Sequence, residues 1–260
     1  MRRPLFHAAL TLLACALLLG GLIAAGRAMR ERLHDSPRHQ FPVRDIDCPA
    51  PPEMEWADFL CEVQYQAELP DNLPLLDDEL PARLASAFAK HAWVERVDRV
   101  SVGPGRAVAV RLTFRTPMLA VRYVPAKGDA VVREVDGTGV LLPKRREPAG
   151  VPRLQTAVHA PAGGAGQPWG DKLVERAAAV CAAVQPHQRE LKLTRVDFAD
   201  GEFRLRTDGG ATVLWGHAPG EEADGEALAE AKVRRLRELY DKYGSLDRAP
   251  TTTIDVRTEK

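Results

Sequence analysis

The chain begins with an apolar run and continues as shorter segments in which apolar and polar positions alternate. Residues 8–26 contain only Ala, Leu, Ile, Gly, Thr and Cys, with no charged side chain. A helix of this length, at ~1.5 Å per residue, nearly matches the ~30 Å hydrocarbon core of a bilayer. The pattern predicts one transmembrane helix at 8–26, in contact with the lipid bilayer and preceded by a short tail at 1–7.

A cleaved signal peptide is the competing interpretation, because the run follows two arginines and ends in small residues at 24–26. The run is longer than the usual ~7–15 residues of a signal-peptide core and is followed by Arg27, which favours a retained anchor. A lipoprotein-like box before Cys15 is disfavoured, since apolar and small residues continue to 26. More arginines follow the run than precede it, so the positive-inside rule opposes an outside location for the large domain without deciding it.

The next segment, 27–58, is rich in Arg, Pro and acidic side chains. Its prolines interrupt any long helix, and they lie at positions 37, 42, 49, 51 and 52. This composition predicts a stalk.

Period-two alternation begins at Phe59, where apolar or small side chains at odd positions to 67 alternate with Glu and Gln. This indicates a half-buried strand at 59–67. The alternative is a first strand at 41–48 followed by a helix at 53–66, which the alternation disfavours. A helix follows from Leu80 to about His91, behind three acidic residues that suit a helix N-terminus.

Two further strands complete this part of the chain. One covers 93–100, and the other places Val108, Val110, Leu112 and Phe114 in strict alternation after a Gly-Pro-Gly turn. All four side chains are expected on one buried face. Residues 59–122 are therefore predicted to fold in the order strand, helix, strand, strand.

The rest of the chain, 123–260, is predicted to form a mainly antiparallel β domain with two flanking helices. An Asp-Gly turn after Val135 indicates a hairpin. Helical apolar spacing predicts helices at about 173–184 and 226–243, and alternation between Gly-containing turns predicts strands at 191–199, 202–207, 211–215 and 251–257. The fold class is α+β.

Composition excludes some classes of function. Apolar residues make up 45% of the chain, charged residues 28%, and the formal net charge is zero. These values are those of an ordinary globular protein, and the absence of a basic excess argues against nucleic acid as a partner. The four cysteines lack the CxxC spacing of a zinc site, so no metal is predicted. Cys48 and Cys61 could form a disulfide in an oxidising compartment, although unpaired thiols are the preferred interpretation.

The series of short motifs resembles the FtsQ/DivIB bacterial cell-division proteins. Residues 85–100, ASAFAKHAWVERVDRV, are similar to the family's helix end and following strand. Residues 114–117, FRTP, resemble its ExRxP element, and the hairpin at 133–142 its DxxG element. Residues 151–154, 213–216 and 254–257 resemble its later motifs, and the last of these reads IDVR.

The resemblance implies a POTRA-like domain at 59–122 followed by the β domain. It also implies a single-pass protein of the inner (cytoplasmic) membrane, with its C-terminal domain extracytoplasmic, that acts at the septum as a non-enzymatic scaffold of the division complex. Its partners would be other membrane-anchored division proteins, without a small-molecule substrate or cofactor. One departure concerns the helices: a POTRA domain has two after its first strand, whereas only one fits here if 59–67 is that strand.

Catalytic motifs are not apparent, because no nucleophile is placed with an orienting base and the sequence contains no GxSxG, HExxH or SxxK. The Gly-rich run at 163–166 lacks the Lys and Ser/Thr of a phosphate-binding loop, which makes it a flexible connection. His217 with Glu221, Glu222 and Asp224 could bind a cation, but a solvated acidic loop explains them more simply. No catalytic or metal-binding residue is predicted.

The terminal strand is the candidate binding site. If it lies at a sheet edge, its unpaired backbone groups can receive a strand from a partner. The predicted partner-binding residues are Thr253, Ile254, Asp255, Val256, Arg257 and Thr258, with Arg257 expected to meet a partner carboxylate. The opposing interpretation is a strand buried between two neighbours.

Three hypotheses of function remain. The first is the division scaffold. The second is a POTRA-type adaptor for envelope assembly or secretion, which tandem repeats or a barrel would favour. The third is an anchored extracytoplasmic enzyme with an unrecognised site.

Overall fold

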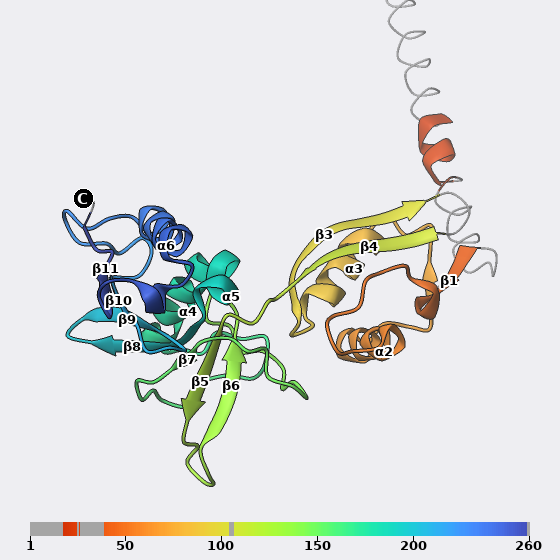
Figure 1. Cartoon of the computed structure of the whole chain (residues 1–260). Helices are drawn as coiled ribbons and strands as arrows, with labels where there is room; N and C mark the ends of the chain where they lie inside the picture. Colours follow the sequence, from red (N-terminus) through yellow and green to blue (C-terminus); the bar gives the residue numbers. More distant parts are fainter. Residues whose placement is uncertain (1–17, 25, 27–38, 104–106, 259–260) are drawn as a thin grey trace, which may run out of the picture. The chain divides into compact units, whose positions relative to one another are not determined.

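The computed structural model describes residues 18–24, 26, 39–103 and 107–258 and confirms the α+β class (Figure 1). The chain divides into two compact units. We call residues up to 91 together with 96–113 the N-terminal unit, and residues 92–95 together with those from 114 onward the C-terminal unit. Each unit is described by itself.

The predicted transmembrane helix requires correction. Residues 8–17 and 25 of the predicted span lie outside the described residues, and so do the predicted tail at 1–7 and residues 27–38 of the predicted stalk. Within the described part, no helix is long and apolar enough to cross a membrane. The part of the predicted span that the structure describes, residues 18–24 and 26, is helical. It also contains Gly20 and Gly21, and glycine disfavours helix formation.

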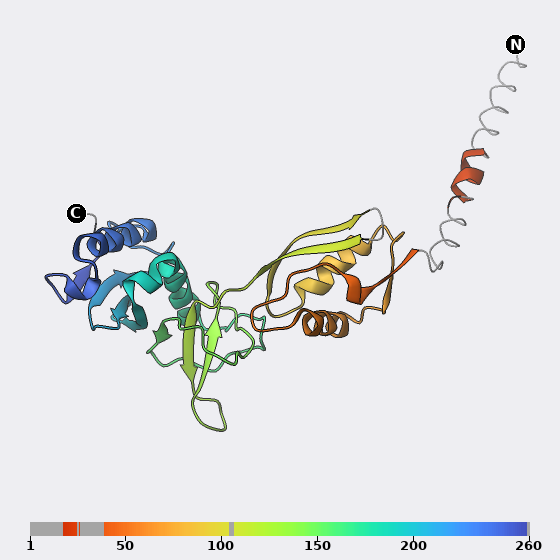
Figure 2. The same cartoon turned by 45° about the vertical axis from the view of Figure 1, so that its right-hand side comes forward.

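The N-terminal unit contains two helices that pack against each other, together with two strand pairs (Figure 2). Strand β1 pairs antiparallel with β2, and β3 pairs with β4. In chain order the elements are β1 (Gln40–Pro42), the short 3-10 helix η2 (Val43–Asp45), α2 (Trp56–Ala67), β2 (Asn72–Pro74), α3 (Leu80–Ala89), β3 (Val94–Gly103, which begins in the other unit) and β4 (Ala107–Phe114).

Helix α2 occupies the segment for which a strand was predicted, so that prediction was wrong. The alternation of apolar and polar residues at 59–67 does not correspond to an alternation of buried and exposed side chains. Phe59 and Val63 are buried, whereas Tyr65 is 85% exposed. Leu60 is buried as well, and positions 59, 60 and 63 form one face of a helix. Glu62, Gln64, Gln66 and Ala67, which are among the remaining residues, favour helix. The unit therefore has two helices before β3, as in the alternative interpretation.

Residues 40–48, which the sequence assigned to the stalk, contribute to the core of this unit. Phe41, Val43 and Ile46 are buried, because β1 pairs with β2 and Asp47 bridges to Ala109 of β4. The predicted buried face of β4 is confirmed at Val108 and Val110, whereas Leu112 and Phe114 are only partly buried.

The C-terminal unit is built on a seven-stranded sheet in the order β11-β10-β9-β8-β7-β5-β6. Its elements are β5 (Leu119–Tyr123), β6 (Val131–Val135), β7 (Arg153–Leu154), α4 (Lys172–Val184), the 3-10 helix η3 (Gln185–His187), α5 (Gln188–Leu191), β8 (Leu193–Ala199), β9 (Glu202–Thr207), β10 (Thr212–Gly216), α6 (Ala229–Tyr243), the 3-10 helix η4 (Leu246–Arg248) and β11 (Thr253–Asp255). The predicted hairpin after β6 is present, with Val135 bridging to Leu141.

The sheet is mixed, which corrects the prediction of a mainly antiparallel one. Pairs β5–β6, β8–β9 and β9–β10 are antiparallel, whereas β5–β7, β7–β8 and β10–β11 are parallel. Parallel neighbours need a long crossover, and two of these connections contain a helix. Helix α4 lies between β7 and β8 in sequence, and α6 lies between β10 and β11.

One face of this sheet forms the core of the unit. Buried side chains from alternate strand positions, such as Val196, Leu205 and Val213, join Ala177 of α4 and Leu236 of α6 in a single cluster. The intervening strand positions point to the other face of the sheet. The candidate site and the arginines discussed below lie on the edge and on that outer face.

Candidate functional site

Strand β11 lies at one end of the seven-stranded sheet, and β10 is its only neighbour among the described residues. It runs parallel to β10, with Thr253 opposite Thr212 and Asp255 opposite Leu214. Residues at even positions bond to β10: the Thr212 N–H donates to the Thr252 carbonyl at 2.8 Å, and the Val256 N–H donates to the Leu214 carbonyl at 3.2 Å. The backbone groups of Thr253 and Asp255 therefore point away from the sheet.

The alternation also divides the side chains of the predicted site. Ile254 and Val256 are 5% and 1% exposed and join the core cluster. Asp255 and Arg257 lie on the opposite side and are partly exposed. The strand is thus anchored by two apolar side chains, and its polar groups remain at the surface.

The two ends of this edge are closed by local bonds. The Thr251 hydroxyl donates to the Thr253 carbonyl at 2.9 Å. At the other end the Ala227 N–H donates to the Arg257 carbonyl at 2.7 Å, and the Arg235 guanidinium donates to the Thr258 carbonyl at 2.8 Å. Three outward backbone groups of the strand have no hydrogen bond within the described chain. They are the N–H of Thr253 and the N–H and carbonyl of Asp255.

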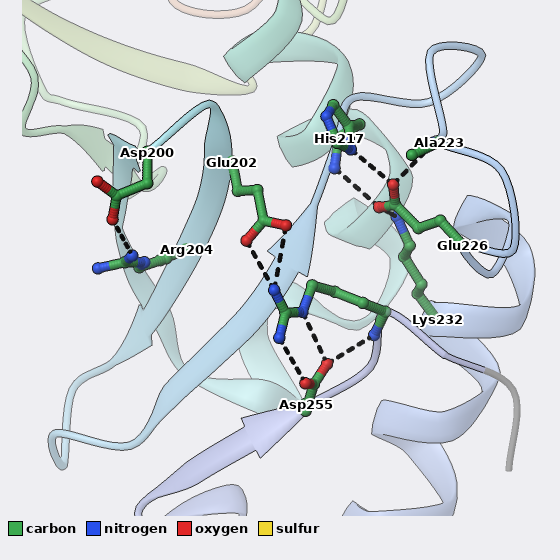
Figure 3. Close-up of polar contacts among 9 residues, drawn as sticks. Asp200, Glu202, Arg204, His217, Ala223, Glu226, Lys232 and Asp255 are labelled. Carbon is green, nitrogen blue, oxygen red and sulfur yellow. Dashed lines mark hydrogen bonds and ion pairs between the residues drawn. The ribbon is translucent and has the colours of Figure 1, made fainter.

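The guanidinium of Arg257 is held by two carboxylates of this chain (Figure 3, where Glu202 and Asp255 are labelled). It lies 2.8 Å from Asp255 Oδ2 and 2.8 Å from Glu202 Oε2. The hydrogen bond from Arg257 lowers the pKa of Asp255, and the carboxylate of Asp255 raises the pKa of Arg257. Arg235 also acts on Asp255, so two carboxylates and two guanidinium groups lie beside the edge.

A second network fixes the loop that closes the edge. Although burial raises the pKa of Glu226, its hydrogen bonds with Lys232, Ala223 and His217 outweigh that effect and lower the pKa to about 2. Lys232 Nζ lies 2.6 Å from the Glu226 carboxylate, and His217 Nδ1 lies 2.6 Å from it (Figure 3). The Lys232 side chain is completely buried and its ammonium lies 5.1 Å from the Trp215 ring centroid. Glu226 precedes Ala227, so this network holds the loop residue that bonds to Arg257.

Gly216 allows these two networks to lie close together at the end of β10. Its φ is +90°, a region that favours glycine. A Cβ at this position would collide with the Glu226 carboxylate and would lie 3.2 Å from Cγ of Arg257. Any side chain at residue 216 would therefore displace both charged groups.

Sequence reasoning missed Glu202, Glu226 and Lys232. Glu202 follows the Asp-Gly turn before β9 and resembled an ordinary surface residue, and a lysine in an amphipathic helix is normally assigned to the solvent side. The Gly-His pair at 216–217 was a usable signal, because a glycine at a strand end often marks a close approach.

The acidic loop considered as a cation site is used internally. Glu221 pairs with Arg176 at 2.7 Å, and Glu222 accepts hydrogen bonds from the N–H groups of Gly220 and Ala229. Among the described residues, no group of three or more His, Cys, Asp or Glu side chains is placed to hold a metal ion. Cys48 and Cys181 are buried free thiols, and Cys61 is an exposed one.

Comparison with protein-family models finds no match for this chain, and comparison with curated proteins finds no relative.

Proposed function

We propose that this protein is a non-enzymatic scaffold of the bacterial cell-division complex, of the FtsQ/DivIB type, and that it binds partner proteins by adding a strand to β11. The observation that carries the proposal is the position of β11 at the end of the sheet, with outward backbone groups at Thr253 and Asp255. Such an edge supplies hydrogen bonds to an extended partner segment. The family assignment rests on the series of sequence motifs.

The charges beside the edge determine which strands would dock well. The sequence predicted that Arg257 would meet a partner carboxylate, but Asp255 and Glu202 of the same chain already surround its guanidinium. Of these groups, Asp255 keeps 45% of its side chain exposed. We therefore expect the preferred partner strand to carry Lys or Arg opposite Asp255, because opposite charges across neighbouring strands are favourable.

The proposal places both folded units on the extracytoplasmic side of the cytoplasmic membrane. Support comes from the sequence resemblance, and a spanning helix at 8–26 is no part of the proposal. The partners would be the extracytoplasmic segments of other membrane-anchored division proteins. One experiment in living cells can test the docking edge, the extracytoplasmic location of the folded units and the membership of the division complex.

The test is photo-crosslinking from the edge. A photoreactive amino acid at residue 253, whose backbone faces outward, is expected to crosslink to an extracytoplasmic segment of a division protein. The matched control carries the same amino acid at Arg237, an exposed residue of α6, and should give no such product. Mass spectrometry of the crosslinked peptides identifies the partner. Crosslinks only to cytoplasmic segments, or equal yields from 253 and 237, would contradict the proposal.

A further inference from the structure

Three arginines lie side by side on the outer face of the C-terminal sheet. Arg153 of β7 is directly opposite Arg195 of β8, and Arg195 is directly opposite Arg206 of β9. Neighbouring strands are ~4.8 Å apart, so the three residues form a short row across the sheet. We call them the arginine row. Arg122 lies on the same face, two positions beyond Ala120, which is opposite Arg153.

Most of this positive charge lacks a counter-charge within the part of the chain that the structure describes. Arg206 pairs with Asp197 at 2.7 Å. Within the described chain, Arg153, Arg195 and Arg122 have no ion-pair or hydrogen-bond partner for their guanidinium groups, and all three are exposed. Like charges directly opposite each other on neighbouring strands destabilise a sheet. The row is therefore unfavourable for the fold itself and would be relieved by an anionic partner.

A groove of about 570 Å³ adjoins the row. It lies where β5 and β7 stop pairing, beyond the last paired residues Val121 and Leu154. Arg122 and Arg153 contribute the charge of its lining, and Tyr123, Val124 and Val158 contribute apolar surface. Val124 is 66% exposed, an unusual position for a large apolar side chain. The surface thus presents guanidinium groups and an apolar recess next to each other.

We propose that the arginine row and this groove form a second docking surface, which binds an acidic segment of a partner protein carrying an apolar side chain among its carboxylates. Guanidinium groups bind carboxylates through paired hydrogen bonds. An extended segment places alternate side chains ~7 Å apart, a spacing that lets two carboxylates reach arginines on separate strands. The apolar recess favours a protein segment over a polyanion, because a polyanion offers nothing to fill it. The surface uses strands other than β11.

The test uses fluorescence anisotropy with the full chain and a labelled eight-residue peptide of alternating Glu and Leu. We expect saturable binding that weakens as salt is raised, as for exposed charges. The double variant Arg153→Gln, Arg195→Gln should bind on the order of tenfold more weakly, as expected when charge-assisted bonds are lost. Its melting temperature should be unchanged or higher, because the substitution removes like-charge repulsion.

The control variant removes the same charge elsewhere. Arg234→Gln, Arg237→Gln alters two exposed arginines of α6, a helix that packs on the opposite face of the sheet, and should bind as the unaltered chain does. A peptide with Gln in place of Glu should not bind. Equal binding by the two double variants would overturn the proposal. So would binding to phosphatidylglycerol vesicles without binding to the acidic peptide, since that would assign the surface to lipid.

Discussion

Replacing Val63 with aspartate is expected to destabilise the N-terminal unit by roughly 4 kcal/mol or more, whereas Tyr65→Asp should change its free energy of unfolding by less than about 0.5 kcal/mol. Val63 is completely buried against the core, so an aspartate there would be a buried, unpaired charge. Tyr65 is 85% exposed on the outer side of α2. The comparison separates a helix from a strand, because in a strand residues 63 and 65 would share one face.

Urea denaturation of the two variants, followed by circular dichroism, measures the difference. The two substitutions introduce the same side chain two positions apart, so charge and helix propensity are closely matched. Similar losses of stability from both variants would contradict the helical assignment of residues 56–67.

Replacing Lys232 with methionine is expected to cost roughly 3–5 kcal/mol of the stability of the C-terminal unit. Methionine fills a similar volume, but it leaves the Glu226 carboxylate, which is 7% exposed, without its main counter-charge. The contact of the ammonium with the Trp215 ring is lost as well. The second substitution Glu226→Gln in the same chain should recover part of the loss, because glutamine is neutral and its single amide oxygen can still accept from the His217 N–H. The Ala223 N–H, which bonds to the other carboxylate oxygen, loses its acceptor.

Tryptophan fluorescence during urea denaturation measures both variants, since Trp215 lies beside the pair. A loss below about 1 kcal/mol for Lys232→Met would mean that Glu226 finds other compensation. A double variant no more stable than the single one would mean that the unpaired charge of Glu226 is not the cause of the loss.

Strands β9 and β10 were predictable because each is short, alternates cleanly and ends at a glycine-containing segment. Strand β8 was predictable from its length and the Asp-Gly turn after it, although a register shift after Leu193 interrupts its alternation. Helix α2 was not predictable in this way, because the apolar or small residues Cys61, Tyr65 and Ala67 extend a period-two pattern that is typical of a strand. Leu60 is the one residue that departs from that pattern. The parallel pairing of β11 with β10 followed in principle from the helix predicted between them, since a helical crossover connects parallel strands. That inference requires knowing that β10 and β11 are neighbours in the sheet, and the hydrophobic periodicity of the sequence does not indicate which strands are neighbours.

The candidate site was only partly predictable. The alternation of 253–257 indicates that Ile254 and Asp255 lie on opposite faces, and the structure shows that Ile254 faces the core. The pairing of Arg257 with Glu202 was not predictable, because Glu202 is distant in sequence and comes close to Arg257 only through the pairing of β9 with β10 and of β10 with β11. The row formed by Arg153, Arg195 and Arg206 depends on strand register, which a single sequence does not reveal.

The fold connects the two networks to the proposed function. The pair of Lys232 and Glu226 fixes the loop before α6, and Ala227 of that loop bonds to the Arg257 carbonyl. The core holds Ile254 and Val256. The edge of β11 is thereby rigid before a partner arrives, which lowers the entropy cost of adding a strand.

The most direct test of the docking edge is partner capture by two proline variants, with the crosslinked partner as bait. Thr253→Pro removes an N–H that points away from the sheet, at the first residue of the strand, where proline is tolerated. Ile254→Pro removes an N–H that faces β10 and serves as the destabilised control. The account predicts that Thr253→Pro keeps the melting temperature of the unaltered chain and loses capture at least tenfold, which corresponds to about 1.4 kcal/mol. Full capture by a folded Thr253→Pro chain would contradict strand addition at β11.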